Sequence, residues 1–175
     1  MLTTTYSLVA ISTEQKNVLS LLSRLQHTIR QCWENLKEFD LPQLEAALNQ
    51  LTQFDRYCQA RKVELYVIPA VRGVAEEVDV LLAELESMTA CGVAILRSVK
   101  EQLRHAIEEG ADKLNELCKT MEVYCEHLFK RLAKEENELL PMVGRILTPE
   151  EWFPIAAKFL LDDAHKNKSS LMHAV

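Results

Sequence analysis

The chain contains two stretches of matching pattern, Gln59-Ala-Arg-Lys-Val63-Glu64-Leu-Tyr-Val-Ile-Pro69 and Arg131-Leu-Ala-Lys-Glu135-Glu136-Asn-Glu-Leu-Leu-Pro141. Each begins with a polar or basic residue, carries a carboxylate about one helical turn later and ends in a proline. Because residues four apart lie on the same face of an α-helix, this spacing predicts two helices that carry polar groups at equivalent depth. The two stretches therefore indicate a pair of structurally related helices.

The rest of the chain shows helical periodicity almost throughout. Only four glycines and five prolines are present, and no window alternates between apolar and polar residues as a half-buried strand does. We therefore predict an all-α, up-down-up-down four-helix bundle over about 12–146, within a single domain 1–175. A capping box, Ser12-Thr-Glu-Gln15, and the sequence Thr148-Pro149-Glu150-Glu151 mark two helix starts. The predicted helices cover about 13–39, 42–70, 78–109 and 112–141, with a short C-terminal helix over 149–163.

Composition excludes several classes of protein. With 175 residues, 48% of them apolar, the chain can bury one hydrophobic core. A formal net charge of −6 argues against nucleic acid as a partner. The first twelve residues show neither a signal peptide nor a membrane anchor, so we expect a cytoplasmic protein without a membrane partner. Five cysteines without a Cys-x-x-Cys pair are typical of reduced, mostly buried thiols.

The two matching stretches resemble the signature of the hemerythrin-like (HHE cation-binding) family. The resemblance covers about residues 11–160 and is most specific from Arg131 to Pro141, followed by Leu147-Thr-Pro-Glu-Glu-Trp152. It implies a four-helix bundle with a dinuclear iron or manganese site formed by histidines and carboxylates. The family's ligand positions correspond to Gln15, Gln59, Val63, Leu85, Arg131 and Glu135 in this chain.

Of these six positions, only Glu135 keeps a side chain of the family's ligand type. A dinuclear site needs several imidazoles and carboxylates, and the permanently charged guanidinium of Arg131 would repel a dication. We therefore expect no cofactor, and we expect Arg131 to fill the former metal position. There Arg131 would pair with Glu135 and form hydrogen bonds with Gln15 and Gln59. Glu64 would also bind Arg131 if the second helix is rotated enough. A buried arginine needs such partners because an unpaired charge in a core costs several kcal/mol.

Other interpretations remain open for the same residues. Gln15 is also the N3 residue of the capping box, and Gln59 and Arg131 can lie on the surface of helices shifted by one residue. A rebuilt metal site would draw on Glu135, His127, Cys58 and Cys125, although lone Cys and His residues more commonly take part in ordinary core or boundary packing.

Two classes of function follow. The first is a non-enzymatic bundle without a metal, which serves as a binding or regulatory module. The alternative is a di-iron protein with substituted ligands that binds oxygen or nitric oxide, stores iron or repairs iron centres. A small anionic ligand beside Arg131 is a third interpretation. The partner would be an unknown protein or that anion, and the size of the bundle is compatible with a homodimer.

Overall fold

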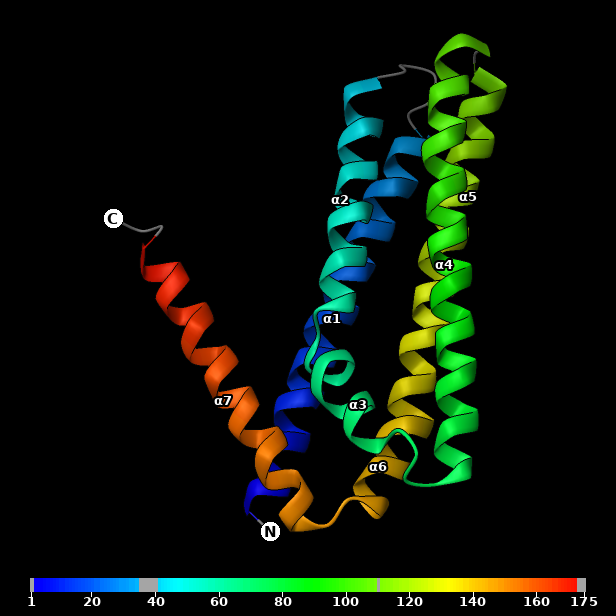
Figure 1. Cartoon of the computed structure of the whole chain (residues 1–175). Coiled ribbons are helices and arrows are strands. Elements are labelled where there is room, and N and C mark those ends of the chain that lie inside the picture. Colours follow the sequence, from blue (N-terminus) through cyan, green and yellow to red (C-terminus); the bar gives the residue numbers. More distant parts are fainter. Residues whose placement is uncertain (1, 35–40, 110, 173–175) are drawn as a thin grey trace.

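The computed structural model describes residues 2–34, 41–109 and 111–172, and within these ranges every regular element is a helix (Figure 1). The predicted all-α class is therefore correct for the described chain. The elements are α1 (Leu2–Glu34), α2 (Leu41–Gln59), η2 (Val63–Val67), α3 (Ile68–Val71), α4 (Glu76–Glu109), α5 (Ala111–Lys134), η3 (Glu135–Leu139), α6 (Leu140–Ile146) and α7 (Pro149–Met172). The two η elements are π-helical.

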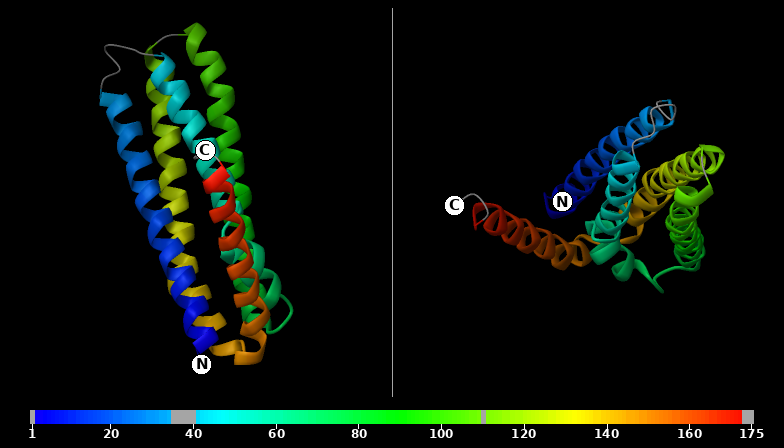
Figure 2. Two further views of the ribbon diagram at one scale, coloured as in Figure 1. Left: turned by 90° about the vertical axis from the view of Figure 1, so that its left-hand side faces the viewer. Right: turned by 90° about the horizontal axis from the view of Figure 1, so that it is seen from above.

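Four long helices, α1, α2, α4 and α5, lie side by side and alternate in direction along the chain (Figures 1 and 2). The short helices α3 and α6 lie together near the end that also holds the N-terminus. From there α7 runs outward, first against α1 and then away from the long helices. The long helices therefore form the main body, and α7 projects from it.

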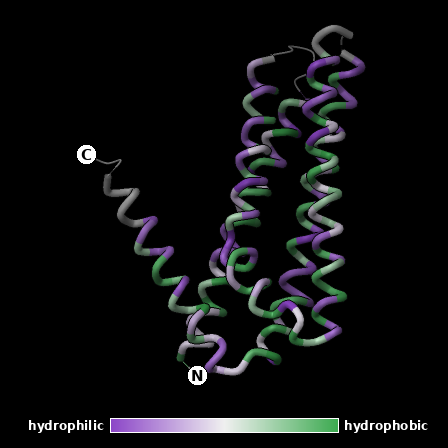
Figure 3. The backbone as a smooth tube through the Cα atoms, viewed as in Figure 1, coloured by the Kyte–Doolittle hydropathy of each residue, from purple (hydrophilic) through white to green (hydrophobic). Residues whose placement is uncertain are grey.

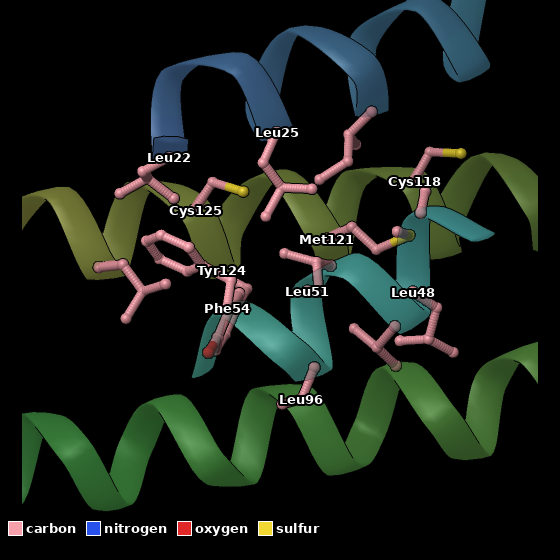
Figure 4. Packing of buried hydrophobic residues seen from close by; sticks show 14 of the residues in the cluster. Leu22, Leu25, Leu48, Leu51, Phe54, Leu96, Cys118, Met121, Tyr124 and Cys125 are labelled. Atoms are coloured by element: carbon pink, nitrogen blue, oxygen red, sulfur yellow. The ribbon is translucent and has the colours of Figure 1, made fainter. Parts of the chain in front are cut away.

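Two hydrophobic clusters fill this body. One joins side chains from all four long helices, and Figure 4 shows them converging: Leu22, Leu25, Leu48, Leu51, Phe54, Leu96, Cys118, Met121, Tyr124 and Cys125. The other lies toward α3, α6 and α7 and includes Ile11, Val67, Leu139, Trp152 and Phe159. Hydrophobic and hydrophilic residues alternate along the tube in Figure 3, as expected for helices that each bury one apolar stripe. In the described part of the chain, no helix is both long and apolar enough to cross a membrane.

The first helix begins earlier than predicted. It starts at Leu2, so the expected capping box at Ser12 lies in the middle of α1. The Thr13 hydroxyl donates to the carbonyl oxygen of Val9 at 2.9 Å, which is the usual bond of a threonine inside a helix. The extension is held by packing, because Ser7 and Ile11 are buried and Ile11 belongs to the cluster that also holds Trp152 and Phe159 of α7. The predicted end of the helix, over 35–39, lies outside the described residues.

The second and fourth predicted helices are interrupted. The chain from 42 to 70 was expected to be one helix, but α2 ends at Gln59 and a turn at Ala60 and Arg61 precedes η2. The helical segment ends at Val71, close to the predicted end at 70, and Gly73 just beyond it has a positive φ of 76° that no helix accommodates. The fourth helix passes through η3 and Pro141 and ends at Ile146, not at the proline.

The last helix starts where the sequence predicts. The Thr148 hydroxyl accepts the Glu151 backbone N–H at 3.3 Å, and the Glu151 carboxylate accepts the Thr148 N–H at 2.8 Å. This reciprocal pair is a capping box. The predicted end at 163 was wrong, since α7 continues to Met172.

Candidate functional site

A layer of polar side chains separates the two hydrophobic clusters. On α1, Gln15 lies between Ile11 of one cluster and Val18 of the other. On α5 and η3, Arg131 and Glu135 take the same intermediate position. The layer also receives side chains from the turn after α2, from η2 and from α4. Its members are Gln15, Arg61, Glu64, Thr89, Arg131 and Glu135, which we call the polar layer.

Arg61 is the centre of the polar layer. Its side chain is completely buried, and its guanidinium meets the equally buried Glu135 carboxylate through two parallel hydrogen bonds of 2.8 Å. It also donates to Gln15 Oε1 at 2.9 Å and to the Cys58 carbonyl oxygen at 3.1 Å. Burial alone would lower the pKa of Arg61, but the Glu135 carboxylate outweighs burial and raises it. Arg61 therefore stays protonated in the core.

Arg131 forms the second cationic centre. Its Nε donates to the Thr89 hydroxyl at 2.9 Å, and its two terminal nitrogens donate to Glu135 and Glu64. Glu64 also lies 3.5 Å from Arg61, so two guanidinium cations and two carboxylates form one connected group. Its formal charge is zero. Such a group avoids the large cost of an isolated buried charge.

Gln15 ties α1 to this group from both ends of its amide. Its oxygen accepts from Arg61, and its Nε2 donates to the Leu132 carbonyl oxygen on α5 at 3.0 Å. The neighbouring Glu14 accepts the backbone N–H of Lys62 at 2.8 Å, which fixes the turn that carries Arg61. The interpretation of Gln15 as an N-terminal capping residue is therefore wrong.

The two matching sequence stretches also share a backbone irregularity. In η2 the Ile68 N–H bonds the Val63 carbonyl oxygen, and in η3 the Leu140 N–H bonds the Glu135 carbonyl oxygen. Both are five-residue steps, and both precede a proline that has no N–H and whose ring would crowd the carbonyl four residues back. Widening the turn relieves that conflict. Single π-turns of this kind are frequent at functional sites.

The structure brings four of the five residues predicted for the polar network together: Gln15, Glu64, Arg131 and Glu135. Gln59 does not join them. It is the last residue of α2, is exposed and donates to Asp55 at 2.9 Å, while the turn at Ala60 and Arg61 changes the placement of the residues that follow it. Arg61 takes the place expected for Gln59. Of the other positions that the resemblance assigns to metal ligands, Val63 and Leu85 are buried in the second hydrophobic cluster.

Sequence reasoning missed Arg61 because two adjacent basic residues normally indicate an exposed helix face. Lys62 is buried as well, and its amine binds Asp163 of α7 at 2.8 Å. The available signal was the matching of the two stretches, since each supplies one arginine and one glutamate to the polar layer. For both stretches to supply these side chains to the same layer, the first stretch has to contain a turn that brings Arg61 inward.

The alternative metal candidates do not converge. Among the described residues, no group of three or more His, Cys, Asp and Glu side chains is arranged to hold a metal ion. His127 donates through Nε2 to the Met88 carbonyl oxygen at 2.6 Å. Burial raises the pKa of both the Cys58 and Cys125 thiols to about 12, so neither is a thiolate at neutral pH. Both oxygens of Glu135 already accept from guanidinium groups.

A small cavity of about 80 Å³ lies beside the polar layer, between α2, α4 and α5. Asp55 and Glu64 contribute carboxylates to its wall, and the guanidinium nitrogens of Arg131 are bound to Thr89, Glu64 and Glu135. An anion there would face two carboxylates. The complete lining is Asp55, Cys58, Gln59, Glu64, Met88, Thr89, Gly92, Leu128 and Arg131.

Comparison with models of known protein families, with curated proteins and with solved structures found no match to this chain. The resemblance to hemerythrin-like proteins therefore rests on the two sequence stretches and on the residues that accompany them.

Proposed function

We propose that this chain is a non-enzymatic four-helix bundle of hemerythrin-like type in which ion pairs replace the di-iron site, and that it serves as a binding or regulatory module. In this proposal α1, α2, α4 and α5 form the up-down-up-down bundle and α7 is the extra C-terminal helix. The observation that carries the proposal is the polar layer, which fills the bundle interior with two guanidinium groups and two carboxylates.

The electrostatics of the layer favour a protein that works without a metal. A divalent ion beside Glu135 would stand within reach of two guanidinium cations that cannot lose their protons. The same carboxylate would have to exchange its hydrogen bonds with Arg61 and Arg131 for the ion. Because the group is already neutral, admitting a dication would leave uncompensated positive charge in a buried layer.

The small anionic ligand considered for Arg131 receives less support. The cavity beside Arg131 has the carboxylates of Asp55 and Glu64 in its wall. Asp55 Oδ1 accepts the Tyr124 hydroxyl at 2.6 Å and Oδ2 accepts from Gln59, so Asp55 is held as an ordered acceptor. These observations argue against an anion in the core, so we propose that the partner is a macromolecule that binds at the surface.

Elemental analysis of protein purified without chelators tests the proposal, together with an ultraviolet and visible spectrum. We expect well below about 0.1 metal ion per chain and no change in Tm when EDTA, Fe²⁺, Mn²⁺ or Zn²⁺ is added. A metal at about 100 times its Kd would stabilise the folded state by about 2.7 kcal/mol and raise Tm by roughly 5–11 °C. Near-stoichiometric iron or manganese, or such a rise, would overturn the proposal in favour of the di-iron alternative.

A further inference from the structure

One side of α7 carries apolar residues that are exposed in the single chain. Phe153 and Leu160 are 67% and 58% exposed, and Ala157 and Ala164 on the same side are exposed as well. These four residues, the α7 seam, follow one another at intervals of four, three and four. That is the spacing of the seam residues in a two-helix coiled coil.

The seam is distinct from the face by which α7 is attached to its own chain. Trp152, Ile155 and Phe159 are buried against the body, and by helical phase they point to the side of the seam, not along it. Asp163 is the last residue of α7 with a described ion pair to the body, to Lys62. The C-terminal part of α7 points away from the long helices, as Figures 1 and 2 show. The seam is therefore open to a second helix.

The order of side chain sizes in the seam selects one arrangement. When two copies of α7 are paired antiparallel about a point between residues 158 and 159, Phe153 of one copy faces Ala164 of the other, and Ala157 faces Leu160. Every layer then combines one large and one small side chain, which allows close packing without voids. A parallel pair would instead place Phe153 against Phe153 and Ala157 against Ala157, alternating a crowded layer with an empty one.

The charges of α7 favour the same arrangement. Its first turn is acidic, with Glu150 and Glu151, and Lys166 lies near its other end. In the antiparallel register the acidic first turn of each copy lies at the level of Lys166 of the partner; by helical phase Glu151 and Lys166 lie on the side of α7 away from the seam and do not face each other across it. The two helix dipoles also oppose each other, which is the favourable orientation. A parallel pair would bring the two acidic ends together.

We propose that the α7 seam is the contact surface of a homodimer in which two copies of this chain pair through antiparallel α7 helices. The proposal is independent of the polar layer, since a metal-containing chain could use the same seam. It needs no rearrangement of the body, because the four seam side chains are already exposed.

Sedimentation equilibrium of the full chain from about 1 to 200 µM, with variants of the seam, tests the proposal. We expect a monomer–dimer equilibrium within this range, and at least a tenfold weaker dimer for Leu160→Glu, which places a charge against Ala157 of the partner. Val80→Glu on α4 is the matched control, because Val80 is 56% exposed and α4 lies on the opposite side of the long helices from α7 (Figure 1). Its dimer Kd should stay within about twofold of the wild type.

A size swap tests the register itself. Phe153→Ala should weaken the dimer by removing the large partner of Ala164, and Ala164→Phe should weaken it by crowding Phe153. The double variant restores one large and one small residue in each outer layer, so its Kd should return to within about threefold of the wild type. A wild-type chain that stays monomeric, an unchanged Kd for Leu160→Glu, or a double variant weaker than both single variants would each overturn the proposal.

Discussion

Replacing Arg61 by alanine tests whether the polar layer holds the fold together. The Arg61 side chain is completely buried, and its removal takes both 2.8 Å hydrogen bonds away from the Glu135 carboxylate, which is also completely buried. Glu135 would keep Arg131 as a partner, while the amide oxygen of Gln15 would lose its donor. Removing one partner of a buried ion pair typically costs about 3–5 kcal/mol.

For a domain of this length, that loss of unfolding free energy corresponds to a fall in Tm of roughly 6–20 °C. Circular dichroism during thermal and urea unfolding measures it, at one fixed protein concentration so that association does not contribute. Arg30→Ala is the matched control. Arg30 pairs with Glu122 but its side chain is 53% exposed, and such surface pairs contribute about 0–1 kcal/mol.

A charge-balanced variant separates the pairing energy from the loss of packing. Replacing Arg61 and Glu135 together by methionine leaves Arg131 paired with Glu64 and removes one charge of each sign. We expect the double variant to lose less stability than the sum of the two single replacements, by about 0.5–3 kcal/mol. If Arg61→Ala lowers Tm no more than Arg30→Ala does, the argument that Arg61 is essential to the core is refuted.

Three further predictions concern other parts of the chain. In the native protein at pH 8, a chromogenic disulfide reagent should modify the exposed Cys91 first, and Cys91→Ser should abolish this rapid reaction; persistence of the rapid phase would contradict the assignment. Burial raises the pKa of three thiols above the ordinary value of 9.0, to about 12, 11 and 12 for Cys58, Cys118 and Cys125. The protonated thiols stabilise the fold fully below pH 9, and this stabilisation is lost as the pH rises toward 11 and 12, because the unfolded chain releases these protons first. The free energy of unfolding from urea titrations should therefore be lower at pH 10.5 than at pH 8. Replacing the three cysteines by alanine should make this difference smaller. Gly73→Ala should lower the free energy of urea unfolding by about 1 kcal/mol because φ is 76° at this residue. Gly144→Ala in α6 should be neutral or stabilising, and at both positions an added Cβ would meet nothing within 4 Å. Equal effects of the two substitutions would exclude a backbone cause.

The helical class and several helix ends were predictable because their causes are local. Thr148 and Glu151 form their capping box within one turn, and Gly73 ends a helix through its own φ. The polar positions Arg131 and Glu135 were predictable for the same reason, since residues four apart on a helix face the same way. Each of these features depends on a few consecutive residues.

Tertiary structure decided the rest. A continuous helix through Gln59 satisfies the local pattern equally well, but it would leave Glu135 without the partner that it has in Arg61, 74 residues away in the chain. The turn at Ala60 and Arg61 changes the helix phase so that a buried carboxylate meets a guanidinium. The N-terminal part of α1 likewise depends on the cluster in which Ile11 packs with Trp152 and Phe159 of α7, at the other end of the sequence. The sequence by itself determined where the chain is helical, because helix formation is local; which side chains meet in the core was determined only by the tertiary structure, because the energy of a buried charge depends on partners that are distant in sequence.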